Sequence, residues 1–136
     1  MQGGQRTGGL ATLALVSGVY DLALAVPMLL VAPRLAEAMG APPPVPLINA
    51  QLNGVFTLSL AAGYFWAARD VEARRGYLWV AGVLAKGLGA ALFVLDHFQH
   101  GSPSTFLLFA VTDGSLAILT AILLGRRARG AGTSRP

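Results

Sequence analysis

The sequence contains no cysteine and a single lysine, Lys86. The lack of cysteine excludes disulfide bonds, thiolate catalysis, cysteine-ligated zinc and iron–sulfur clusters. Charged residues are also scarce, at 12% of the 136 residues, whereas a soluble domain carries about 25%. The few charges gather in short clusters between long apolar runs, and 54% of the residues are hydrophobic. This pattern excludes a solvated globular surface and a disordered chain, and it predicts a protein embedded in the lipid bilayer.

Motifs of soluble enzymes are lacking as well. The sequence has no glycine-rich phosphate loop, no Gly-x-Ser-x-Gly elbow and no His-Glu-x-x-His pair, so a hydrolase, kinase or metalloprotease has no motif behind it. The only histidines, His97 and His100, stand at helical spacing beside Asp96. Two histidines and one aspartate at a water interface are more typical of solvated helix ends than of a metal site. We therefore expect no metal, and the catalytic residues of any enzymatic activity stay unknown.

Four apolar segments are long enough to cross a bilayer, because its ~30 Å core needs about 20 residues of helix. They are residues 9–32, 47–68, 76–98 and 105–125. All three connections are short, and the first contains a run of prolines that predicts a stiff, extended link. Short connections place consecutive spans side by side and opposite in direction. The fold expected is an all-α membrane protein, an antiparallel bundle of four transmembrane helices.

Basic residues near the ends of the spans predict the orientation. The N-terminus, the second connection and the basic tail, residues 126–136, hold eight arginines, whereas Arg34 stands alone on the other side. Because positive charge is retained on the cytoplasmic side, both termini are expected to be cytoplasmic. The tail is better explained by this topology and by anionic lipid head groups than by nucleic acid. Residues 1–136 are thus expected to form one integral membrane domain.

Aromatic residues agree with this orientation. Tyr64 and Trp66 end the second span, and Tyr77 and Trp79 begin the third. Tyrosine and tryptophan are enriched where a membrane meets water. The four residues therefore predict an aromatic belt at the cytoplasmic interface.

Three charged residues lie near the middle of the spans, away from their ends: Asp21, Lys86 and Asp113. At ~1.5 Å per helical residue, they stand about 18, 15 and 18 Å from the cytoplasmic ends of three different spans. A charge at this depth costs at least ~2.5 to 3.5 kcal/mol, so three separate lipid-facing charges are implausible. Small residues flank all three and are typical of helix contact faces. We expect the three side chains to face inward and meet near the midplane.

Two interpretations of this cluster remain open. It is either a structural ion triad that holds the helices in register, or a site for protons or a polar ligand. Two acids against one base leave a surplus negative charge, which protonation or a bound cation would remove. Tyr20, beside Asp21, is a further candidate for the site. Asn53 is a candidate for the outer mouth of a cavity above the cluster.

Residues 63–70 (GYFWAARD), 85–89 (AKGLG) and 112–114 (TDG) resemble signature positions of a group of small bacterial four-span proteins of uncharacterised function. In size and layout the chain is similar to the DoxX-like membrane proteins. Some DoxX-like proteins are associated with quinone-linked oxidoreductases. The resemblance therefore implies a redox accessory role in a bacterial inner membrane, with a quinone as cofactor.

Three functions follow as alternatives. The first is a small polytopic membrane protein whose triad supports the bundle or contacts a partner subunit or a second copy. The second is a site for protons, a quinone or another amphiphile. The third is a membrane-embedded enzyme that uses a buried aspartate as general acid. The sequence does not decide among them, so the protein's status as an enzyme stays uncertain.

Overall fold

The computed structural model describes the backbone of residues 3–132 and the side chains of residues 8–128, and this part of the chain has helices and no strands. Arg6 and the basic tail beyond Ala128 lie outside the described side chains. The long helices are α1 (Gly3–Leu30), α3 (Leu47–Arg69), α5 (Lys86–His100) and α6 (Leu107–Gly132).

Shorter elements complete the fold. They are α2 (Ala32–Ala38), α4 (Arg75–Tyr77), the π-helix η1 (Leu78–Ala85) and the 3₁₀ turn η2 (Ser104–Phe106). Since α4, η1 and α5 follow one another without a break, residues 75–100 form one continuous helix. Counted this way, the described chain has five helices.

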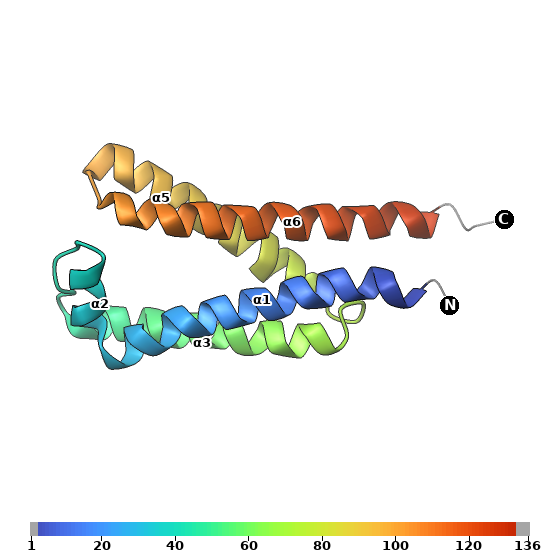
Figure 1. Cartoon of the computed structure of the whole chain (residues 1–136), viewed down its shortest axis with the longest axis horizontal. Coiled ribbons are helices and arrows are strands. Elements are labelled where there is room, and N and C mark those ends of the chain that lie inside the picture. The colour runs from blue at the N-terminus through green and yellow to red at the C-terminus, as the bar shows by residue number, and fades with distance from the viewer. Residues whose placement is uncertain (1–2, 133–136) are drawn as a thin grey trace.

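The long helices form two hairpins (Figure 1). One consists of α1 packed along α3, and the other of α5 packed along α6. The element η1 passes between them and contacts α6. Both ends of the chain lie at the same end of the molecule, with α2 and the turn between α5 and α6 at the other. Consecutive long helices therefore run in opposite directions, as the short connections predict.

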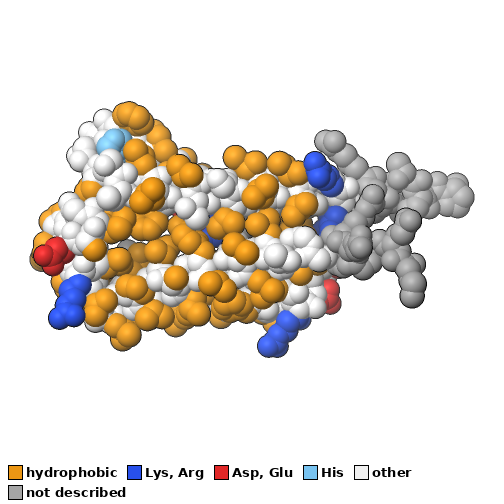
Figure 2. Space-filling view, viewed as in Figure 1, with side chains coloured by type: hydrophobic (Ala, Val, Ile, Leu, Met, Phe, Trp, Pro, Cys, Tyr) orange, Lys and Arg blue, Asp and Glu red, His pale blue; other side chains and the backbone are white. Residues whose placement is uncertain are grey.

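Three helices are long and apolar enough to cross a membrane, by length and composition: Gly8–Leu30, Arg75–His100 and Ser104–Ala128. The predicted second span coincides with α3, but α3 is not among them. Asn49, Gln51 and Asn53 make its first turns polar. Figure 2 shows hydrophobic side chains over most of the visible face, with charged side chains mainly toward its two ends. Such a surface is typical of a polytopic membrane protein.

The first connection differs from the expectation. The sequence predicts an extended link over residues 33–46, whereas Ala32–Ala38 forms the helix α2, with Pro33 in its first turn. Proline is tolerated there because the first N–H groups of a helix have no partner within the helix. The extended part begins only at Ala41 and carries the remaining prolines.

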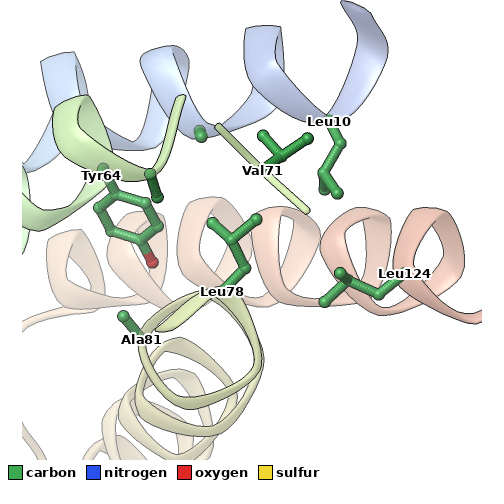
Figure 3. Packing of buried hydrophobic residues seen from close by; sticks show 8 residues of the cluster. Leu10, Tyr64, Val71, Leu78, Ala81 and Leu124 are labelled. Atoms are coloured by element: carbon green, nitrogen blue, oxygen red, sulfur yellow. The ribbon is translucent and has the colours of Figure 1, made fainter. Parts of the chain in front are cut away.

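The hydrophobic core lies at the end of the molecule where the chain begins and ends (Figure 3). Helix α1, α3, η1, α6 and the loop after α3 each contribute a buried side chain: Leu10, Tyr64, Leu78, Leu124 and Val71. Ion pairs reinforce the same end, because Glu72 of that loop pairs with both Arg75 and Arg127. The two hairpins are thus joined at this end.

Of the residues assigned to an aromatic belt, the tryptophans are exposed, as a belt requires, whereas Tyr64 is buried and contradicts the prediction. Trp66 and Trp79 are 51% and 44% exposed, and the Arg74 guanidinium lies 4.2 Å from the Trp66 ring centroid. Tyr64 is only 1% exposed and belongs to the core. Its side chain points into the space between the hairpins rather than toward lipid head groups, because it stands on the inner face of α3.

Candidate functional site

Asp21, Lys86 and Asp113 meet inside the helices. Lys86 Nζ donates hydrogen bonds to Asp21 Oδ1 at 2.7 Å and to Asp113 Oδ1 at 2.9 Å. These residues come from α1, α5 and α6, so a single ammonium group links both hairpins. The expectation that these side chains face inward and meet is confirmed, and we refer to the three residues as the triad.

Small residues let the helices come close around the triad. Gly18, one turn before Asp21, packs against the Phe65 ring so tightly that a Cβ atom would lie 2.9 Å from it. Gly82 faces Thr120 and Gly114 faces Ala90, where a Cβ would meet the neighbouring side chain at 3.0 and 3.6 Å. The predicted contact role of small residues is therefore confirmed for α1, η1 and α6 and is wrong for Gly89 of α5, where nothing lies within 4 Å of an added Cβ atom.

Lys86 begins α5 at the point where the π-helix η1 ends. A π-helix has i→i+5 hydrogen bonds and a wider turn than an α-helix, so it changes the direction in which the following side chains point. Such segments are rare and are frequent at functional sites. The sequence analysis did not predict this segment, since apolar periodicity does not distinguish a π-turn from an α-turn.

Several buried polar atoms of the triad and of residues on α1 and α3 have no hydrogen-bond partner in the described part of the chain. Asp21 Oδ2 is buried and has no hydrogen-bond partner among the described residues. The same holds for the hydroxyl groups of Ser17, Tyr20 and Tyr64 within the described part of the chain. Lys86 Nζ lies 4.8 Å from the Tyr20 ring centroid and 5.6 Å from that of Tyr64. Since buried polar atoms are normally hydrogen-bonded, this cluster is an exception that calls for an explanation.

The triad forms one wall of a cavity of about 200 Å³. Asp113 is the most accessible of the three, with 15% of its side chain exposed against 5% for Asp21 and 7% for Lys86. Tyr20 also lines this cavity, as the sequence analysis expects of a site residue. The other walls are mainly apolar: Leu24, Met28, Thr57, Leu60, Ala85, Phe93 and Phe109.

Asn53 does not contact this first cavity. It lines a second cavity, of about 250 Å³, toward α2 and the proline-rich link. Met28, Phe93 and Phe109 line both cavities, so the two spaces share a wall. Asn53 is therefore separated from the triad by the first cavity, and it lies toward α2, at the end of the molecule opposite the start of α1.

The two histidines are engaged separately at the far end of α5. His97 Nδ1 lies 2.7 Å from the carbonyl oxygen of Ser102, and His100 Nδ1 lies 2.9 Å from Asp96 Oδ1. Within the described residues, no group of three or more His, Asp or Glu side chains is placed to hold a metal ion.

No family model, curated protein or solved structure matches the chain. The resemblance to DoxX-like proteins is thus not supported by the comparisons. The fold and the site rest on the residues of this chain alone.

Three aromatic residues of the site were missed by sequence reasoning. Phe93 and Phe109 line the first cavity, and Tyr64 lies beside Lys86. Phe93 stands seven residues after Lys86, and Phe109 four before Asp113. Both spacings place the phenylalanine on the same helix face as the triad residue. That spacing is a signal available in the sequence.

Proposed function

We propose that this chain is a four-span membrane protein whose triad binds the polar end of a small ligand within the bilayer. The cavity carries the proposal. A structural ion triad gains most from a dry, fully paired arrangement. Here the triad borders about 200 Å³ of space, and Asp21 Oδ2 is unpaired among the described residues. An apolar pocket with a few convergent polar groups is the usual form of a small-molecule site.

The proposal includes α3 as the fourth span and both termini on the cytoplasmic side. Support for the fourth span comes from the packing of α3 along most of α1, whose residues 8–30 are of membrane-spanning length and hydropathy. Support for the orientation comes from the arginines, including Arg69, Arg74 and Arg75, at the end of the molecule that carries both termini. The polar start of α3 then lies near the opposite membrane surface.

Native mass spectrometry from mild detergent tests the ligand site. Wild-type protein is compared with Asp113→Asn, and the matched control is Asp96→Asn, which changes an exposed aspartate that does not line the cavity. We expect a discrete added mass on the wild type and on the control, and its loss from Asp113→Asn. Circular dichroism and gel filtration are used to check that the Asp113→Asn variant is folded.

Two results would overturn the proposal: no added mass on the wild type, or the same mass retained by Asp113→Asn. Either would favour the structural triad. The added mass also identifies the ligand class, so a quinone, as a redox accessory role would require, is distinguished directly from other molecules.

A further inference from the structure

We infer that the ligand is a lipophilic cation, a molecule with one ammonium group and an apolar body. This inference rests on the proposed function and specifies its ligand. It follows from the charge of the triad, the unpaired acceptor atoms and the nature of the cavity walls.

The charge of the triad favours a cation. Two carboxylates face one ammonium group, so the ionised triad carries one surplus negative charge. Asp96 is the one acidic residue between Lys86 and Asp113 in the sequence. It pairs with His100 at the far end of α5 and does not line the cavity. A surplus charge in a low-dielectric interior is costly unless it is neutralised. A ligand ammonium group entering the cavity supplies the missing positive charge.

The hydrogen-bonding atoms point to a donor rather than an acceptor. Lys86 bonds to the Oδ1 atom of each aspartate, and the buried Asp21 Oδ2 has no partner in the described chain. Asp113 lines the cavity and is the most accessible member of the triad. An ammonium group has three N–H donors and no acceptor, so it complements free carboxylate oxygens. An anionic ligand would meet these same oxygens and would have to compete for a lysine that is already bonded twice.

The cavity walls suit an apolar body next to the charged group. Tyr20, Phe93 and Phe109 present aromatic rings to the first cavity, and aromatic faces attract cations in addition to packing against hydrocarbon. The second cavity shares Met28 and both phenylalanines with the first, and its other walls are apolar apart from Asn53. A ligand tail that extends from the triad past Phe93 and Phe109 therefore remains in apolar surroundings.

Three probes with the same 4-phenylbutyl tail and different head groups test the inference: 4-phenylbutylamine, 4-phenylbutanol and 5-phenylpentanoate. Binding is measured by isothermal titration calorimetry on full-length protein in lipid nanodiscs, with empty nanodiscs subtracted. We expect the amine to bind the wild type about tenfold more tightly than the alcohol, because a charge-assisted hydrogen bond is stronger than a neutral one, and the carboxylate not to saturate. Asp96→Asn should behave as the wild type does.

Asp113→Asn removes the surplus charge and keeps the shape of the side chain. We expect the amine-to-alcohol ratio to fall from about tenfold to about one in this variant, since only the charge-assisted part of binding is lost. The order of the three affinities for the wild type tests the inference of a cationic ligand even if Asp113→Asn does not fold. An alcohol or a carboxylate that binds the wild type as tightly as the amine overturns the inference.

The failure of the inference and that of the proposed function are distinguishable. If the alcohol matches the amine and both lose affinity in Asp113→Asn, the triad is a ligand site but does not select a cation. If the wild type retains an endogenous mass and no probe binds, the cation inference again fails alone. If no probe binds and no endogenous mass is retained, both fail, and the triad is structural.

Discussion

Lys86 Nζ lies 2.7 Å from Asp21 Oδ1 and so joins residues that are 65 positions apart in the chain. The bond links α1 of one hairpin to α5 of the other. The hydrophobic core does the same at the end where the termini lie, through Tyr64, Leu78 and Leu124. The hairpins are thus held by apolar packing at one end and by charge farther along the helices.

Lys86→Met should strongly destabilise the protein. It leaves the buried Asp21 and the partly buried Asp113 without their cation, and removing one partner of a buried pair costs about 3–5 kcal/mol of unfolding free energy. The triple variant with Asp21→Asn and Asp113→Asn should recover most of that loss, because no uncompensated charge remains. Unfolding by SDS titration in mixed micelles measures both. Arg34→Met, which removes an exposed cation, serves as control; a single Lys86→Met variant as stable as this control would contradict the prediction.

Tyr77→Phe and Tyr64→Phe should differ in effect although the two rings pack edge to face, with centroids 5.4 Å apart. The Tyr77 hydroxyl donates a hydrogen bond to the Leu60 carbonyl at 2.6 Å, so its removal should cost about 0.5–1.5 kcal/mol. The buried Tyr64 hydroxyl has no such partner among the described residues, so its removal should cost nothing or stabilise the protein. The same SDS titration compares them, and an equal loss for both would show that Tyr64 has a hydrogen bond after all.

Gly63→Ala should destabilise the packing of α3 against α4. A Cβ atom at residue 63 would overlap the end of the Tyr77 ring, so the ring must move and its hydrogen bond to Leu60 is strained or lost. Overpacking of this kind typically costs about 1–3 kcal/mol. Gly89→Ala is the matched control, since nothing lies within 4 Å of its added Cβ. That control should be neutral or slightly stabilising, because alanine favours a helix more than glycine does. Equal behaviour of the two variants would argue against the close contact.

Single cysteines should report the membrane topology. The chain has no cysteine of its own, so Pro43→Cys, Ala73→Cys and Ser104→Cys each place one thiol at an exposed position in a connection. A membrane-impermeant maleimide should label positions 43 and 104 in intact cells, and position 73 only after permeabilisation. If positions 43 and 73 react on the same side, α3 does not cross the membrane. If labelling is reversed at all three positions, the proposed orientation is wrong.

Much of the fold follows from the sequence. Apolar length predicts the long helices, because the hydrocarbon core demands about 20 residues of helix. The predicted second span, residues 47–68, differs from α3 only in the terminal Arg69. Three helices have the length and hydropathy of a membrane span. That α3, whose first turns are polar, is a fourth span stays a prediction. The helix α2 inside the first connection was not predicted, and Pro33 fits its first turn because the first N–H groups of a helix have no partner within it.

The sequence by itself also determined that Asp21, Lys86 and Asp113 meet. Because a helix rises by a constant distance per residue, the position of a residue in a span gives its depth in the membrane. Because a lipid-facing charge is costly, three charges at the same depth are expected to contact one another. Only the tertiary structure decided what surrounds them. The π-helix before Lys86, the burial of Tyr64 and the cavity beside Asp113 depend on how each helix is rotated against its neighbours. That rotation is set by contacts between side chains far apart in the chain, which local sequence patterns do not encode.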